Sequence, residues 1–134
     1  MKATSVNVLA KIVGQVGLFE VPVKTFEDIE NVLGGFADIA YLDCGISLIY
    51  RAQTLGEHEN NDVNMVMEIE GIPELFFGNC LFCNEVLPDI DSHDEEFKLE
   101  PLTKEQVSWI IDTTEQGFIP FKGEIKPVLI LKYS

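Results

Sequence analysis

Short runs in which apolar and polar residues alternate recur along this chain, and they constrain its fold more than any other feature. Side chains two positions apart in a strand point to the same face, so each run predicts a strand with one buried face. Pro22 and Pro127 lack an amide donor, so we expect their strands to lie at sheet edges. An almost wholly apolar run, 76–86, predicts a buried central strand. The other segments that predict strands are 5–13, 18–24, 36–42, 46–51 and 124–133.

Two further segments carry helix signals. Thr25 precedes acidic residues and an apolar stripe that ends at Gly34-Gly35, which predicts a short capped helix with a glycine stop. Thr103 and Gln106 fit a capping box at the start of a second helix. Residues 62–70 alternate, but their Met and Glu favour a helix, so we expect helical or irregular structure there. The sequence therefore predicts an α+β fold: a mainly antiparallel sheet of five to six strands, one short helix after the first hairpin and one helix near the C-terminus.

The size and composition of the chain indicate one domain, spanning residues 1–134. A chain of 134 residues is near the commonest domain size. Three cysteines, an odd number, argue against a secreted disulfide framework. No apolar run approaches the ~20 residues of a membrane span, and the N-terminal residues alternate where a signal peptide would be continuously apolar. We therefore expect a cytoplasmic protein with no membrane partner.

The charge is strongly acidic and unevenly distributed. The chain has 9 basic and 23 acidic residues, for a net charge of −14, and no basic residue lies between Arg51 and Lys98. Such a field repels nucleic acid and favours a protein partner with a basic surface, although acidic residues also serve solubility alone. If region 52–97 is a binding face, the residues expected to contact the partner are Glu57, Glu59, Asp62, Asp89, Asp91, Asp94, Glu95 and Glu96.

The residues that could carry chemistry do not form a known catalytic or metal-binding pattern. Cys80 and Cys83 are spaced as in a metal or redox motif, but in a strand they would point to opposite faces, one to the core and one away. The acidic loop 89–100 fits a calcium-loop template in part, but the glycine position holds Asp94. No nucleophile elbow or phosphate loop accompanies the two histidines. We expect no enzyme activity, no cofactor and no bound metal.

Two other functions remain open. A sponge or sensor for a small nucleotide-derived signal would need aromatic and cationic side chains, and Tyr41, Tyr50, Arg51 and Lys98 could line a pocket between protomers. A structural or assembly protein could pair its edge strands in a homodimer. Arg51 ends a predicted strand, so Arg51→Ala is expected to change stability by less than about 1 kcal/mol.

Several segments together resemble a small domain family of unknown function found in bacteria, phages and plasmids. The matching residues are Val32-Leu33-Gly34-Gly35-Phe36, Asp38-Ile39, Leu42, Asp43-Cys44-Gly45-Ile46-Ser47-Leu48, Phe77-Gly78-Asn79-Cys80-Leu81 and Pro101-Leu102-Thr103-Lys104-Glu105-Gln106-Val107. The resemblance covers roughly residues 18–112; the chain departs from the pattern at 58–64, where an Asn-rich loop with proline is usual, and at 117–134. It implies a fold with a Gly-Gly helix stop, a Gly-Asn strand and a terminal Leu-Thr-x-x-Gln helix.

The same resemblance implies a function of a mobile element. Small acidic proteins of phages commonly disarm a host defence by occupying a site on it, an argument by analogy. The expectation is a non-enzymatic viral accessory protein that acts in the host cytoplasm as a host-defence inhibitor.

Overall fold

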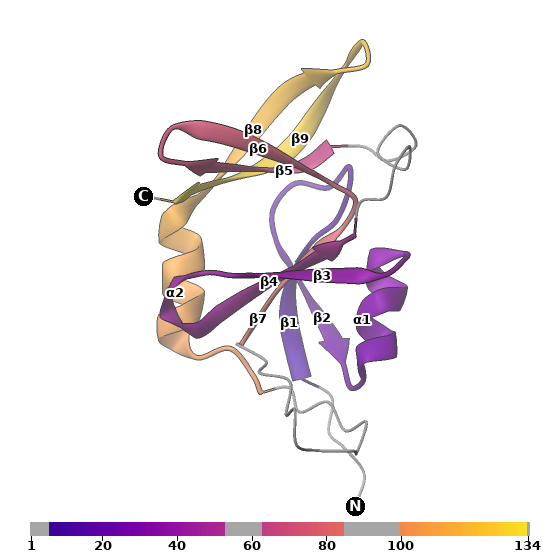
Figure 1. Ribbon diagram of the computed structural model, residues 1–134, viewed down its shortest axis with the longest axis vertical. Helices are drawn as coiled ribbons and strands as arrows, with labels where there is room; N and C mark the ends of the chain where they lie inside the picture. Colours follow the sequence, from indigo (N-terminus) through magenta and orange to yellow (C-terminus); the bar gives the residue numbers. More distant parts are fainter. Residues whose placement is uncertain (1–5, 53–62, 85–99, 134) are drawn as a thin grey trace, which may run out of the picture.

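The computed structural model describes residues 6–52, 63–84 and 100–133, and these form two sheets and two helices (Figure 1). Its strands are β1 (Val6–Lys11), β2 (Phe19–Val23), β3 (Ala37–Tyr41), β4 (Ile46–Arg51), β5 (Val63–Ile69), β6 (Ile72–Phe77), β7 (Cys80–Asn84), β8 (Thr114–Phe121) and β9 (Glu124–Tyr133). Its helices are α1 (Phe26–Leu33) and α2 (Lys104–Thr113), with a 3-10 turn, η1 (Asp43–Gly45). The α+β class is confirmed, but the expectation of one sheet with five to six strands was wrong: the described residues form nine strands in two sheets.

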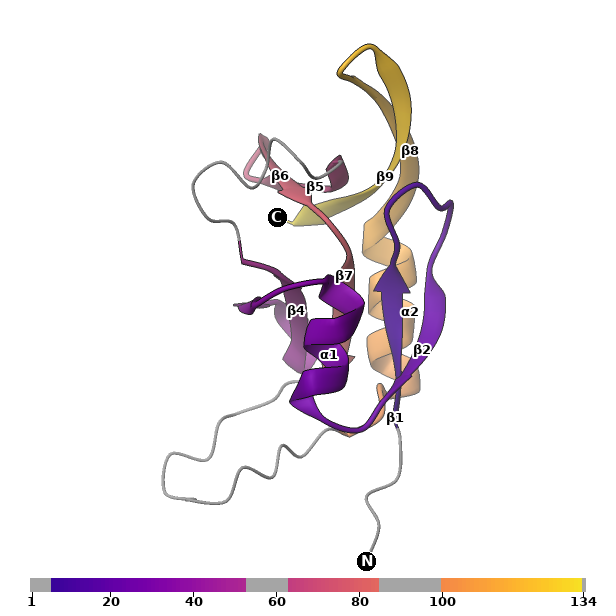
Figure 2. The ribbon, with the colours of Figure 1, turned by 90° about the vertical axis from the view of Figure 1, so that its right-hand side faces the viewer.

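Sheet A has the order β2-β1-β7-β4-β3, and every neighbouring pair in it is antiparallel. Sheet B has the order β6-β5-β9-β8 and contains one parallel pair, β5 with β9. Helix α1 lies on one side of sheet A, and sheet B and α2 lie on the other (Figure 2). Sheet A is therefore the central layer, covered on both faces.

The two faces of sheet A contribute to two separate hydrophobic cores. The face toward α1 packs Val8, Leu81 and Cys83 against Ile29 and Leu33 of the helix. The face toward sheet B supplies part of a larger core. Its buried members are Ile46, Leu48, Met65, Met67, Phe76, Cys80, Phe82, Ile110, Leu129 and Leu131.

Both helices begin where their cap residues predict. The Thr25 side chain accepts from the Asp28 backbone, and the Asp28 carboxylate accepts from the Thr25 backbone in return. Thr103 and Gln106 form the same reciprocal pair at α2. Helix α1 ends at Gly34, which has a φ of 79° and so occupies the left-handed region that glycine adopts without strain.

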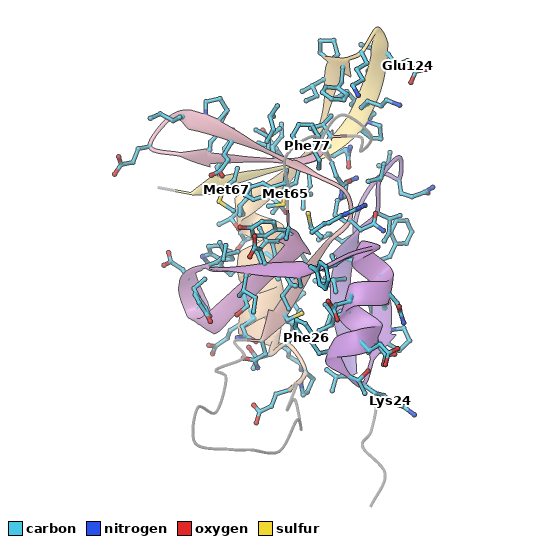
Figure 3. All side chains as sticks on the ribbon, turned by 45° about the vertical axis from the view of Figure 1, so that its right-hand side comes forward. Lys24, Phe26, Met65, Met67, Phe77 and Glu124 are labelled. Carbon is cyan, nitrogen blue, oxygen red and sulfur yellow. The ribbon has the colours of Figure 1, made fainter. Side chains whose placement is uncertain are left out.

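The expectation of a helix or irregular structure at residues 62–70 was wrong, because the described part of this segment is strand β5. The alternation of its apolar residues outweighs the helix propensity of its Met and Glu residues, since a partner strand lies on each side. Met65 and Met67 extend from β5 into the core between the sheets (Figure 3).

The predicted central strand at 76–86 is divided between the two sheets. Phe76 and Phe77 end β6 in sheet B, and Cys80 begins β7 at the centre of sheet A. Gly78 lies between them with a φ of 86°, a backbone conformation that lets the chain leave one sheet and enter the other. The central position of β7 agrees with the prediction, whereas the single continuous strand does not.

Of the two strands that were expected at sheet edges because they contain proline, one is an edge strand and the other is not. The strand of Pro22, β2, is an edge of sheet A, as predicted. The strand of Pro127, β9, is not an edge, because it lies between β5 and β8. Pro127 pairs with Phe118 of β8, and β5 joins β9 only from Leu129 onward, so the missing amide falls outside the β5 ladder.

Among the helices of the described residues, none combines the length and the apolar composition required to cross a membrane.

Candidate functional site

A buried polar cluster lies where the two sheets meet. The Lys11 side chain, on the last residue of β1, is 0% exposed. Its Nζ donates to Asn64 Oδ1 at 2.8 Å and to the Ile12 carbonyl at 3.1 Å. Asn64 Nδ2 donates in turn to the carbonyls of Lys11 and Gly78, both at 2.8 Å. The cluster therefore ties β1 of sheet A to β5 of sheet B.

A β-bulge places Asn64 in this cluster. The register between β5 and β6 shifts between Val63 and Met65, so Asn64 has no partner in β6. Bulges redirect a side chain from the regular alternation. Met65 then lies in the core between the sheets, and Val63 lies in a smaller core on the other face of sheet B.

Burial controls the protonation of the groups around the cluster. It lowers the pKa of Lys11, which has no carboxylate partner among the described residues. Cys80 pairs with Lys11 across β1 and β7, and burial raises the pKa of its thiol to about 12, although Asn64 and Lys11 act in the opposite direction. Burial also raises the pKa of Cys83 to about 12. Neither thiol is ionised at neutral pH, so neither is a ready nucleophile.

The cysteine pair is split between the two cores. Cys80 faces sheet B and Cys83 faces α1, as the i, i+3 spacing in a strand predicts. The expectation that one of them would point away from the core was wrong, because both faces of β7 are covered. No group of three or more potential metal-ligating side chains occurs within residues 6–52, 63–84 and 100–133.

The Arg51 side chain packs over the backbone of several glycine residues. A Cβ atom added at Gly35 would lie 3.0 Å from Arg51 Nε, and one added at Gly78 would lie 3.7 Å from the Arg51 stem. The glycines thus leave the space that the arginine occupies. Arg51 is half-buried, so its stem contributes packing that the expected stability effect of less than about 1 kcal/mol did not include.

Asn79 joins the same region to helix α1. Its Oδ1 accepts from the Val13 backbone at 2.9 Å, and its Nδ2 donates to the Val32 carbonyl at 2.8 Å. The Gly-Gly and Gly-Asn segments of the sequence therefore meet around Arg51 and Asn79 and have a structural explanation. Lys11 and Asn64 were missed from the sequence, where only a lone Lys and a lone Asn within apolar strands marked them, whereas Asn79 was named as part of the Gly-Asn motif without a role.

The residues proposed for a ligand pocket do not come together within one chain. Tyr41 pairs with Ser47 on the face of sheet A toward α1, whereas Tyr50 packs on the opposite face, edge-on to Phe76. Burial, with the nearby carboxylates of Asp38 and Glu74, raises the pKa of Tyr50. Arg51 shares the Tyr41 face but lies at the other end of the strand pair. Lys98 falls outside the described residues.

Two surface hollows of about 410 Å³ each occur in the described part of the chain, and neither is lined by Lys11, Tyr50 or Arg51. One lies between β1 and the start of α2, and its walls include Leu9, Leu102 and Val107. The other is shallow and includes Cys44 and Trp109. Neither gathers several cations, as a phosphorylated ligand would require.

The eight acidic residues expected to bind a partner all lie in segments 53–62 and 85–99, outside the described residues. Their points of attachment are nevertheless defined. Strands β4 and β7 are antiparallel, so the chain leaves sheet A after β4 at one end and after β7 at the other. The two segments therefore start from opposite ends of sheet A.

Several cations of the described residues are buried or paired. Lys11 is buried, Lys126 contacts Glu124 at 2.7 Å, and Lys132 contacts Glu115 at 3.2 Å. Of these three cations of the described residues, only Lys11 is withdrawn from the surface, while Lys126 and Lys132 each offset one carboxylate there.

Comparison of the chain with family models, with curated proteins and with solved structures found no match.

Proposed function

We propose that this protein acts by binding and not by catalysis, and that its acidic segments bind a basic surface on another protein. The observation that carries the proposal is the separation of charge. Twelve carboxylates and no cation lie between Arg51 and Lys98. Burial of Lys11 further reduces the positive charge at the surface.

The groups that could have supported catalysis favour the same proposal. The thiols of Cys80 and Cys83 are buried and protonated at neutral pH. Within the described residues, the Lys11 cluster is closed from solvent and its hydrogen bonds connect two sheets. Both features are typical of a structural core and not of a reaction site.

The family resemblance supports a biological setting for this binding. Under the proposal, the protein is an accessory protein of a phage or other mobile element that occupies a basic, nucleic-acid-binding surface of a host defence protein. Opposite charges would speed the encounter and make the affinity depend on salt.

The test uses two matched variants and one control. Glu57→Gln/Glu59→Gln/Asp62→Asn and Asp89→Asn/Asp91→Asn/Asp94→Asn each remove three charges from one segment. The control, Glu20→Gln/Glu105→Gln/Asp112→Asn, removes three charges from exposed positions elsewhere. The full-length protein is used to capture a partner from a bacterial lysate, and the purified partner is then titrated by calorimetry.

We expect at least one segment variant to weaken binding by about tenfold at low salt, with a smaller difference at physiological ionic strength, about 0.15 M. The control should bind like the wild type. Equal affinity for all four proteins, or an affinity that does not change with salt, would show that charge does not drive the interaction. The two variants also identify which of the two acidic segments contacts the partner.

A further inference from the structure

Sheets A and B have four edge strands in the described residues: β2, β3, β6 and β8. Three of them contain a proline, which is Pro22 in β2, Pro73 in β6 and Pro120 in β8. Proline has no amide donor, and proteins place it at sheet edges to discourage an additional strand. The remaining edge, β3, has the sequence ADIAY, with neither a proline nor a basic residue.

Within the described residues, β3 has no partner strand along its outer side. The Leu42 amide donates to the Ile46 carbonyl, and the Ala52 amide donates to the Phe36 carbonyl, so both of these pairs between β3 and β4 are hydrogen-bonded. Bonded and non-bonded pairs alternate in an antiparallel ladder. The amides and carbonyls of Ala37, Ile39 and Tyr41 therefore point away from β4, toward the free edge.

The side chains at this edge are suited to an alternating ligand. On the face toward α1, Ile39 is half-buried and Tyr41 is 53% exposed. On the opposite face, Asp38 is exposed and lies with Glu74 in the neighbourhood of Tyr50. One face of an added strand would meet apolar surface and the other would meet carboxylates.

We propose that the β3 edge is a docking site for an extended segment of a partner protein in which basic and apolar residues alternate. The segment would add a sixth strand to sheet A, with its backbone bonded to Ala37, Ile39 and Tyr41. Its apolar side chains would lie beside Ile39 and Tyr41, and a Lys or Arg would lie beside Asp38. The inference rests on the proposed function, because it specifies how a basic partner is held.

A second copy of this chain fits the edge less well. Two β3 strands would bring two Asp38 carboxylates and two strongly acidic molecules together, and like charges at a sheet interface are unfavourable. A basic strand has no such repulsion, so charge complementarity selects the foreign partner.

The experiment measures binding of the full-length protein to a defined probe, a fluorescent peptide of four Lys-Val repeats, by anisotropy. A second peptide with the same sequence and N-methylated backbone amides keeps the charge but cannot form a strand ladder. Ile39→Pro removes an outward amide that β4 does not use. Asp38→Lys reverses the edge charge, and Glu20→Lys makes the same charge change on β2, the opposite edge of sheet A.

We expect the unmethylated peptide to bind the wild type at least tenfold more tightly than the methylated peptide. Ile39→Pro and Asp38→Lys should each weaken its binding about tenfold, and Glu20→Lys should have a much smaller effect. Amide shifts at Ala37, Ile39 and Tyr41 in nuclear magnetic resonance spectra should accompany binding. If Ile39→Pro does not fold, Asp38→Lys and the comparison of the two peptides still test the docking site.

Equal binding of the two peptides, with no effect of the β3 variants, would overturn the docking site and leave the proposed function standing. Absence of binding by either peptide at low salt would count against the basic-partner function itself. A dimer in light scattering that Ile39→Pro converts to a monomer would assign the edge to a second copy and overturn the inference.

Discussion

The two faces of sheet A are both buried but are built in different ways. The face toward α1 is packed by aliphatic side chains and one thiol. The face toward sheet B combines a larger apolar core with the bonded cluster of Lys11 and Asn64. Apolar contacts are non-directional, whereas hydrogen bonds have a preferred geometry. The difference indicates that α1 is held mainly by burial, with the bond from Asn79 to the Val32 carbonyl at its C-terminal end, while the position of sheet B relative to sheet A is also fixed by a fully buried network of bonds.

The largest expected effect comes from removing the hydrogen bonds of the Lys11 and Asn64 cluster, on the face of sheet A toward sheet B. Asn64→Ala leaves the Lys11 ammonium buried without its side-chain acceptor and two carbonyls without their donor. We expect a loss of about 3–5 kcal/mol of unfolding free energy, measured by urea denaturation with Trp109 fluorescence. Adding Lys11→Met should recover part of this loss. A double variant that is as unstable as the sum of the single variants would show that the two residues are not coupled.

Truncating an apolar side chain on the face of sheet A toward α1 should lower the unfolding free energy by a smaller amount. Ile29→Ala removes a side chain that is buried between α1 and sheet A, and we expect a loss of about 2–4 kcal/mol. Ile110→Ala, on α2, makes the same change in the core toward sheet B and serves as the matched control. Similar losses for the two isoleucines would assign the additional cost of Asn64→Ala to the polar cluster. Very different losses would show that apolar packing, and not bonding, distinguishes the faces.

Arg51 provides an intermediate case, because its stem packs over backbone and it lies beside the segment that links the sheets. We expect Arg51→Ala to lower stability by about 1–2 kcal/mol through lost packing. Gly35→Ala should also destabilise, since its Cβ would lie 3.0 Å from Arg51 Nε. Thermal unfolding of the double variant should show a cost below the sum of the two single variants. Strict additivity would mean that the glycine is not required to accommodate the arginine.

The last effect is a pH dependence of the unfolding free energy, to which the buried thiols on both faces of sheet A contribute. Folding raises the pKa of Cys80 and Cys83 from 9.0 to about 12, so the folded state retains two protons that the unfolded state loses above about pH 9. Stability should therefore be full below pH 9 and decrease above it, by at most about 1.4 kcal/mol per pH unit for each thiol.

Lys11 acts in the opposite direction in this range. Its folded pKa is lowered below 10.5, so it adds stability as pH rises toward that value, and its contribution has the opposite sign to that of the thiols. Urea titrations from pH 8 to pH 10 on Cys80→Ala and Cys83→Ala should each show a shallower decrease than the wild type. An unchanged slope in both variants would exclude the thiols as its origin.

The sequence predicts the local elements of this fold better than their arrangement. The caps at Thr25 and Thr103 depend on residues three positions apart, which the sequence displays directly. The place of β9 between β5 and β8 depends on contacts between distant segments, and no local pattern encodes it. The helix propensity of Met and Glu led to a wrong prediction at β5, because pairing with neighbouring strands outweighs that propensity.

The candidate site was harder to predict for a related reason. Alternation in β1 assigned Lys11 to the polar face of a strand, and such a face is normally exposed. In this fold sheet B covers that face, so the lysine is buried and requires an acceptor. The bulge that provides Asn64 is visible only once β5 and β6 are paired. Likewise, the unprotected edge of β3 is recognised only when all four edges are known.

The insertion of β9 between β5 and β8 also has a consequence for the order of events during synthesis. Sheet A contains only strands that leave the ribosome before α2, so it can pair early. In sheet B, β5 and β6 emerge long before β9, and until then β5 has one unpaired edge beside Met65 and Met67. A nascent chain at this stage exposes an apolar strand with an unpaired edge, and such strands commonly start aggregation. Slow elongation after β6 should therefore lower the yield of native protein more than slow elongation before it.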